Sequence, residues 1–222
     1  MTIADNNLKS LCNDILNSGN NTLGEKVRPK YADGTPSHTM FVNQVFERYD
    51  LSKGELPIVT LRHVAWKSGI KEILWIYQDQ SNNLDLLRDK YGITWWDEWD
   101  LGDRTIGQRY GATVKRYKLI DKLLENLKKQ PYGRRHIINL YQEADLEATA
   151  GLFPCAMETQ WSVRDGYLDL TLIQRSSDVA VANAINKIQY VALQMMVARH
   201  VGLEPGVFCH YVNNAHIYDR HV

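Results

Sequence analysis

Residues 157–173 read METQWSVRDGYLDLTLI, in which apolar and polar residues alternate on both sides of Asp165-Gly166. This pattern is typical of a β-hairpin closed by a tight turn. Because a hairpin brings its outer ends together, we expect Cys155, just before the first strand, to lie close to Arg175, just after the second. A guanidinium favours the thiolate form of a nearby cysteine. The hairpin therefore predicts both the centre of the fold and a candidate nucleophile.

Length and composition favour one domain over residues 1–222. The chain has 222 residues, of which 44% are hydrophobic, and the 26 basic residues balance the 26 acidic ones. This balance argues against general nucleic-acid binding, and the apolar runs are too short to span a membrane. Three cysteines at wide spacing give no disulfide or metal framework. With no secretory leader visible, we expect a cytoplasmic protein.

Hydrophobic periodicity predicts the other elements. The expected helices cover residues 8–16, 65–78, 117–127 and 184–200, the last one ended by Gly202. The expected strands cover residues 40–49, 57–61, 137–141 and 207–212, with a turn at 213–215 after the last one.

Glu72 is a candidate acid inside the helix over residues 65–78. This helix is apolar almost all round, and Glu72 shares a face with Trp75 and Ile76. Lost hydration there would favour the protonated carboxyl and raise its pKa, as at many functional sites. Pairing of Glu72 with an arginine or lysine is an equally good interpretation of the sequence alone.

Three further features each have a structural and a functional interpretation. The tryptophans at 95, 96 and 99 are typical of a core, yet they would also stack on a planar heterocycle. Arg134-Arg135 would be solvated in most proteins, but the pair could also clamp an anion. Asn186 shares an apolar helix face with Tyr190, so its amide needs a partner, in the backbone or in a ligand.

Taken in order, these motifs resemble the thymidylate synthase family. The resemblance spans about residues 8–221 and rests on Glu72-Ile73-Leu74-Trp75, Trp96-Asp97-Glu98-Trp99, Ile106-Gly107, Tyr110-Gly111, Arg134-Arg135-His136-Ile137, Phe153-Pro154-Cys155, Gln174-Arg175-Ser176-Ser177-Asp178, Asn186 with Tyr190, and His216-Ile217-Tyr218. It implies an α+β fold in which a large mixed β-sheet packs with helices on one face and forms a homodimer through the other.

The resemblance also implies reductive methylation of dUMP to dTMP, with 5,10-methylenetetrahydrofolate as cosubstrate and no metal. Its implied catalytic residues are Cys155, Glu72, Tyr110, Arg175 and Asn186. The residues implied to bind dUMP are Arg28, Gln174, Arg175, Ser176, Asn186, His216 and Tyr218, with Arg134 and Arg135 reaching across from the partner subunit. The residues implied to line the folate site are Trp96, Trp99 and Asp178.

The chain departs from the family pattern in several places. Ala156 follows the nucleophile where histidine is common, Ala182-Asn183-Ala184-Ile185 replaces a Gly-x-Pro-Phe run, and Asn213-Asn214 replaces Gly-Asp. Arg28 is the candidate for the phosphate-loop arginine, because an ungapped alignment places Gly34 there. The closing C-terminal segment of the family is expected to be absent. Two alternatives stay open: a deoxyuridylate hydroxymethylase on the same fold, and a nucleotide-binding paralogue without turnover.

Overall fold

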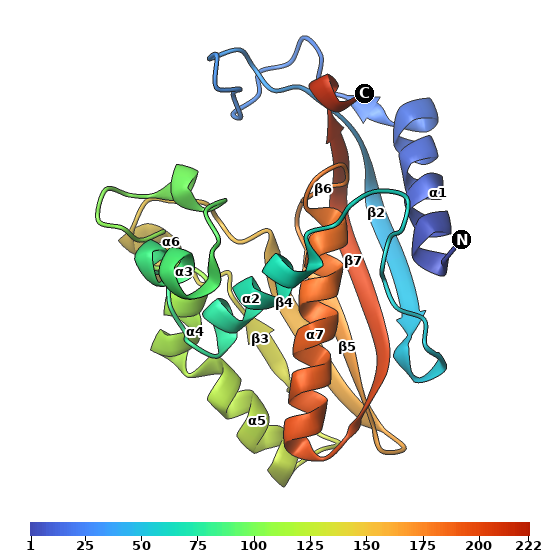
Figure 1. Cartoon of the computed structure of the whole chain (residues 1–222), viewed down its shortest axis with the longest axis vertical. Coiled ribbons are helices and arrows are strands. Elements are labelled where there is room, and N and C mark those ends of the chain that lie inside the picture. The colour runs from blue at the N-terminus through green and yellow to red at the C-terminus, as the bar shows by residue number, and fades with distance from the viewer.

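A seven-stranded mixed β-sheet is the central element of the fold. The computed structural model describes residues 1–222 except for the side chain of Ser18. The strands run in the order β1-β2-β7-β5-β4-β3, and β6 pairs with β7. Their bounds are β1 Asn20–Asn21, β2 Thr39–Asp50, β3 Ile137–Asn139, β4 Ala156–Arg164, β5 Tyr167–Gln174, β6 Ser177–Asp178 and β7 Glu204–Tyr218. Figure 1 shows the long central strands side by side, with most of the helices gathered along one side of them. The predicted α+β class is confirmed.

The predicted hairpin is confirmed as β4 and β5. Arg164 pairs with Tyr167, and Asp165 and Gly166 both have positive φ, 49° and 82°. Two consecutive positive φ angles are what a type I′ turn requires, and its twist matches that of the flanking strands. At the open end of the hairpin, Ala156 pairs with Gln174. Cys155 and Arg175 are therefore neighbours, as expected.

Strand β7 is the structural centre of the sheet. It pairs antiparallel with β2 and parallel with β5. The predicted strand over 207–212 is part of it, but the predicted turn at 213–215 is wrong. Ladder pairs continue through Asn214 opposite Asn43 to Tyr218 opposite Thr39. Pairing with β2 keeps this polar stretch extended, which its composition alone does not indicate.

The helices are α1 Ile3–Ser18, α2 Trp66–Tyr77, α3 Leu84–Tyr91, α4 Gly111–Tyr117, α5 Leu119–Lys129, α6 Glu143–Ala148 and α7 Asn183–Val201. Short 3-10 turns cover Leu51–Lys53, Asp97–Trp99 and Asp219–His221. Helix α7 lies along β5 and β7 and packs on α2 (Figure 1). Between them lies the main core, to which Leu168, Leu170 and Leu172 contribute from alternate positions of β5. The intervening side chains of β5 face the other side of the sheet and are half-buried.

Two predicted elements are wrong. Residues 57–61 form no strand, because the Thr60 backbone N–H and hydroxyl both donate to Asp5 and the Thr2 hydroxyl donates to the Ile58 carbonyl. These bonds tie the segment to the start of α1 and compete with a ladder. The predicted helix over 117–127 is divided into α4 and α5 at Lys118, whose left-handed conformation ends the first helix.

Two further predictions need smaller corrections. Trp66 at the start of α2 is exposed, so this helix is not buried all round. The predicted strand over 137–141 ends at Asn139, whose side chain accepts a hydrogen bond from the Tyr141 backbone. Within the described residues, no helix is both long enough and apolar enough to cross a membrane.

Candidate active site

Cys155 and Arg175 meet at the open end of the hairpin. The Arg175 Nη2 atom lies 3.4 Å from Cys155 Sγ and donates to the Phe153 carbonyl at 2.7 Å. Arg175 Nε donates to the Pro154 carbonyl at 3.0 Å, and the Arg175 backbone N–H donates to the Cys155 carbonyl at 3.0 Å. The guanidinium is thus fixed by the carbonyls of the two residues that precede the thiol it faces. The predicted pair is confirmed.

Arg175 favours the Cys155 thiolate, as expected, but it is not the largest influence on the thiol. Burial raises the pKa of the Cys155 thiol, and the positive charges of Arg175 and Arg28 offset this only in part. Desolvation disfavours any charged form, and here it outweighs the two cations. Arg28 is exposed in the loop that precedes β2, and its charge favours the Cys155 thiolate. Its role as the phosphate-loop arginine stays a prediction.

Glu72 on α2 is buried, and its hydrogen-bond donors are neutral. The indole N–H groups of Trp95 and Trp96 donate to its two carboxylate oxygens at 2.8 and 2.9 Å. Burial raises the pKa of Glu72 to about 7, although these hydrogen bonds act to lower it. The predicted rise in the pKa of Glu72 is confirmed. The alternative, in which an arginine or lysine pairs with Glu72, is wrong, because its partners are the two indoles.

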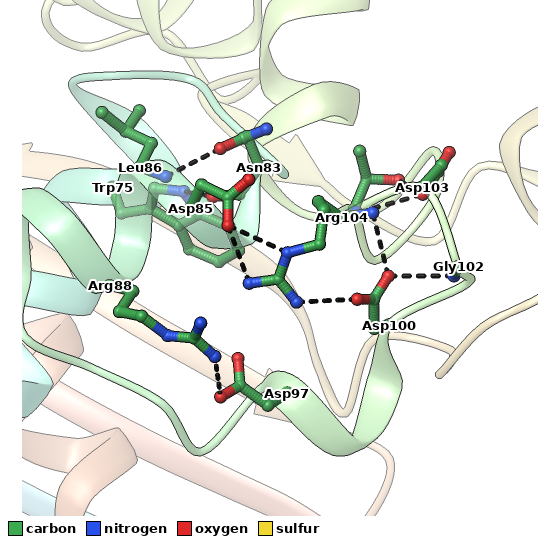
Figure 2. Close-up of polar contacts among 11 residues, drawn as sticks. Trp75, Asn83, Asp85, Leu86, Arg88, Asp97, Asp100, Gly102, Asp103 and Arg104 are labelled. Carbon is green, nitrogen blue, oxygen red and sulfur yellow. Dashed lines mark hydrogen bonds and ion pairs between the residues drawn. The ribbon is translucent and has the colours of Figure 1, made fainter.

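Ion pairs shape the loop that presents these tryptophans (Figure 2). Arg104 lies between Asp85 of α3 and Asp100 of the loop, at 2.8 Å from each, and Arg88 contacts Asp97 at 2.6 Å. The loop is thereby held against α3. Exposed pairs of this kind each stabilise little, but together they define one conformation.

The three tryptophans differ in what their indoles can contact. Trp96 is buried against Trp75 and Tyr110, and its N–H is occupied by Glu72. Trp99 is 38% exposed, and Trp95 is 40% exposed. Trp99 and Trp95 therefore offer the open aromatic surface, whereas Trp96 mainly supports Glu72.

Tyr110 connects the tryptophans to the nucleophile. Its hydroxyl accepts a hydrogen bond from the Cys155 backbone N–H at 3.2 Å, and its ring lies 5.2 Å from that of Trp96. Burial raises the pKa of Tyr110 well above its usual value, so the phenol stays neutral. Tyr110 has a φ of 46°, an uncommon value for a bulky residue. Such backbone strain is frequent at functional sites.

Asn186 lies near the start of α7, with both ends of its amide bonded to other amides. Gln174 Nε2 donates to Asn186 Oδ1 at 3.2 Å, and Asn186 Nδ2 donates to Gln189 Oε1 at 2.9 Å. Gln174 is buried beside His210, which is bonded to Gln174 Oε1. The partner that the sequence requires for Asn186 is thus a pair of glutamines.

The remaining candidates from the end of the chain lie along β6 and β7. Asp178 pairs with His216 in the ladder, and its carboxylate accepts hydrogen bonds from the Ala180 and Val181 backbone N–H groups. His216 bonds to Asn214, and its ring lies 5.2 Å from that of Tyr218. Cys155 and Arg28 both influence the Tyr218 hydroxyl, whose pKa is raised mainly by burial. Ser176, half-buried, lies in the connection between β5 and β6.

Arg134 and Arg135 do not join this cluster within one chain. Both are exposed, in the turn before β3, where they line a surface hollow with Tyr132 and Gly133. Ile137 pairs with Gln160, and the five residues from there back to Cys155 span about 17 Å of strand. The two arginines therefore lie far from the nucleophile of their own chain.

Sequence reasoning missed two residues that contact the site, Gln189 and His210, and it did not anticipate the hydrogen bond from Trp95 to Glu72. Only Gln189 left a usable signal, since it lies three positions after Asn186 and on the same helix face. The roles of Trp95 and His210 depend on tertiary contacts.

Comparisons with known proteins agree with this geometry. A family model described as thymidylate synthase matches residues 6–222. Thymidylate synthases from Lactococcus lactis subsp. cremoris (strain SK11) and Streptococcus pneumoniae (strain 70585) are 54% and 53% identical to the chain, each over 99% of it and 80% of the relative. A solved structure of thermostable thymidylate synthase A from Bacillus subtilis superposes with a TM-score of 0.91 at 40% identity, covering 98% of the chain and 80% of that structure's chain.

Proposed function

The chain belongs to the thymidylate synthase family, and on this premise we propose that it converts dUMP to dTMP with 5,10-methylenetetrahydrofolate as donor of both the carbon and the hydride. The observation that carries the proposal is the arrangement around Cys155: Arg175 contacts its sulfur, Tyr110 contacts its backbone, and Glu72 is held next to Tyr110 by Trp96. The enzyme is a methyltransferase.

Cys155 supplies the nucleophile. Its sulfur adds to C6 of the uracil ring, and the electrons of the C5–C6 double bond move toward O4, so that C5 becomes a carbon nucleophile for the folate methylene. Because burial raises the pKa of the free thiol, bound nucleotide must favour the thiolate through Arg175 or through proton transfer in the site.

Glu72 and Tyr110 move protons. With a pKa raised to about 7, Glu72 can both accept and release a proton at neutral pH, which suits transfer around O4 and the folate nitrogen. Tyr110, neutral and beside Cys155, assists removal of the proton from C5.

Asn186 and the polar end of β7 orient the nucleotide. The Asn186 amide has one donor and one acceptor that match O4 and N3–H of uracil. His216 and Tyr218 bind the ribose hydroxyl, while Ser176, Arg175 and Arg28 face the phosphate. Gln174 contributes to nucleotide binding through Asn186, because its side chain is only 1% exposed and donates a hydrogen bond to Asn186.

The folate occupies the side of the site bounded by Trp99 and Asp178. Trp99 offers an exposed aromatic face of the kind a pterin stacks on. Asp178 carries a carboxylate at the start of the α7 connection. Trp96 contributes through Glu72, because its N–H is already bonded. Among the described residues, no group of three or more His, Cys, Asp or Glu side chains is placed to hold a metal ion.

The protein forms a homodimer through the face of the sheet opposite α7. Phe46 and Ile137 are 59% and 48% exposed there, and a second subunit would cover them. The partner subunit's Arg134 and Arg135 complete the phosphate site, because a phosphate carries close to two negative charges and these arginines are too far from the Cys155 of their own chain. The free cysteines suit a reducing compartment, which supports the cytoplasm.

Turnover with dUMP and 5,10-methylenetetrahydrofolate tests the proposal. We expect dTMP, identified by mass, and one dihydrofolate per dTMP, followed by absorbance. Cys155→Ser should lower kcat by on the order of 1,000-fold, because a hydroxyl is a far weaker nucleophile than a thiolate. Cys209→Ser, a half-buried cysteine of β7, is the matched control and should leave turnover unchanged. Undiminished dTMP formation by Cys155→Ser would refute the role of Cys155 as nucleophile. If the product is 5-hydroxymethyl-dUMP, the protein is a hydroxymethylase and not a synthase.

A further inference from the structure

Arg109 is a buried arginine that ties the segment before α4 to the segment before Cys155. It is 1% exposed, and its guanidinium donates to three main-chain carbonyls. Nη1 donates to the carbonyl of Asp145, while Nη2 donates to those of Leu146 at 3.2 Å and Thr149 at 2.7 Å. A buried charge costs stability unless hydrogen bonds compensate for it. These bonds therefore hold Arg109 and residues 145–149 in one arrangement.

The carbonyls that Arg109 occupies belong to the end of α6 and the residue that follows it. The last carbonyls of a helix have no partner within the helix, and a basic side chain can supply one. In return, the buried Asp145 carboxylate of α6 accepts from Thr113 at 2.6 Å and from Arg116 at 2.8 Å, both on α4. The two helices are thus bonded in both directions, and they lie in the same group of helices in Figure 1.

Residues 149–154, the nucleophile loop, lead from α6 to Cys155. In the described structure, no backbone–backbone hydrogen bond involves a residue of this loop. Arg109 holds the start of the loop through the Thr149 carbonyl, and Arg175 holds its end through the Phe153 carbonyl. The path of the loop therefore depends on two guanidiniums.

Phe153 connects these two arginines. The Arg109 guanidinium lies over the Phe153 ring, 5.3 Å from its centroid, and the ring of Tyr141 packs edge-on at 5.9 Å. Phe153 is 41% exposed, so these contacts orient it more than burial does. Its carbonyl accepts from Arg175 Nη2, the atom that lies 3.4 Å from Cys155 Sγ. Arg109 thus supports the residue whose carbonyl holds Arg175 in place.

We propose that Arg109 is a positioning residue for the nucleophile: it fixes the nucleophile loop, and through it the Arg175 guanidinium that faces the Cys155 sulfur. The inference rests on the proposed function and deepens it by adding a residue that acts through another one. The next residue in the chain, Tyr110, contacts the Cys155 backbone N–H. Residues 109 and 110 therefore support the nucleophile from two sides, one through the loop and one directly.

The charge of the thiol is set by groups other than Arg109. The ionisable side chains that act on the Cys155 thiol are two cations and two neutral phenols, Arg175, Arg28, Tyr110 and Tyr218. Burial raises the pKa of the thiol, and the two cations lower it. Arg109 is not one of these groups, so its removal should change the thiol only by moving Arg175.

The test measures the rate at which iodoacetamide alkylates Cys155, from about pH 7 to about pH 10.5, on the full chain without nucleotide or folate. Cys12→Ser and Cys209→Ser, introduced together, leave Cys155 as the only thiol among the three cysteines of the sequence. Adding Arg109→Met should lower the rate at about pH 8 roughly ten-fold and move the pH profile to higher pH, because the thiolate is the reactive form.

A double-mutant cycle identifies the route of this effect. In an Arg175→Met background, Arg109→Met should change the rate by less than about two-fold, because the guanidinium that Arg109 positions is already gone. Arg116→Met is the matched control. It removes another arginine that joins α4 to α6, but it leaves Arg109 on the carbonyls of residues 145–149. This control should keep the wild-type profile.

Phe153→Leu answers the same question if Arg109→Met does not fold. It keeps the main-chain carbonyl and removes the ring under the Arg109 guanidinium, so it should also slow alkylation, and only while Arg175 is present. A wild-type profile in folded Arg109→Met, or in Phe153→Leu if the first variant does not fold, would overturn the proposal. So would an equal shift in Arg116→Met, or an undiminished effect of Arg109→Met in the Arg175→Met background.

Turnover of the wild type separates this inference from the proposed function, because alkylation needs neither substrate. If the wild type forms dTMP but Arg109→Met leaves the alkylation profile unchanged, only the role of Arg109 is refuted. If Arg109→Met shifts the profile but the wild type forms no dTMP, only the synthase is refuted.

Discussion

Glu72 links the chemistry of the site to the stability of the protein. Its pKa is raised from 4.5 to about 7 on folding, so between these values the folded state binds more protons than the unfolded state. The free energy of unfolding must then fall as pH rises through this window. The shift corresponds to on the order of 3 kcal/mol once Glu72 is fully ionised.

Glu72→Gln should remove this dependence. We expect the free energy of unfolding of the variant, measured by urea denaturation from about pH 4.5 to about pH 8, to change less with pH than that of the wild type. The gap between the two proteins should favour the variant increasingly toward high pH. Glu147→Gln, on the exposed face of α6, should follow the wild type. Parallel curves for Glu72→Gln and wild type would mean that Glu72 titrates normally in the folded protein.

Individual residues were predictable from the sequence where their surroundings are local. Cys155 and Arg175 lie at the two ends of one hairpin, so pairing rules place them together. The burial of Glu72 follows from its helix face. The donors on Glu72 and the glutamines around Asn186 were not predictable, because they come from segments that only the folded sheet and helices bring together.

Gly111 is the point at which α4 fits against the segment after α2. A Cβ atom at this position would lie 2.1 Å from the Ser81 carbonyl oxygen and 2.5 Å from its backbone nitrogen. Because both are main-chain atoms, the helix start would have to move, and with it the adjacent Tyr110, which contacts Cys155.

We therefore expect Gly111→Ala to lower the free energy of unfolding by about 1–3 kcal/mol and to lower kcat as well, measured by chemical denaturation and turnover. Gly54→Ala is the control. Gly54 has a φ of 76° with open space around it, so the substitution costs stability through backbone conformation alone and should leave kcat unchanged. An unchanged kcat in Gly111→Ala would show that the start of α4 does not position Tyr110.

The elements themselves differ in how well the sequence predicts them. The β4–β5 hairpin and α7 have strong local signals, the Asp165-Gly166 turn and the Gly202 stop. The division between α4 and α5 has none, because Lys118 is neither glycine nor proline and takes a left-handed conformation only in the fold. The extension of β7 past Val212 likewise depends on pairing with β2, more than 160 positions away.

At the scale of the whole molecule, the proposed dimer predicts that inactive variants can complement each other. Cys155→Ala leaves the arginines intact, and a variant with Arg134→Ala and Arg135→Ala leaves the nucleophile intact. If the arginines act across the interface, a mixed dimer has one complete site, and activity should return to about half of wild type per mixed dimer.

The control mixes Cys155→Ala with Glu72→Gln. Both residues belong to the same subunit's cluster, so both sites of that mixed dimer stay damaged and no activity should return. Subunit exchange is verified by mass on differently tagged chains. Lack of recovery in the first mixture despite confirmed exchange would mean that Arg134 and Arg135 serve their own chain.

The central position of β7 has a consequence for how the protein is made. A ribosome delivers the chain from its N-terminus at about 5–20 residues per second, and β7 follows every other strand in the sequence. Until it emerges, β2 and β5 lack the strand that lies between them. Such long-range pairing slows folding and leaves strand edges open to wrong partners. Until β7 emerges, the nascent chain therefore holds the two halves of the sheet unjoined, and the strand that joins them also brings His210, His216 and Tyr218 to the site.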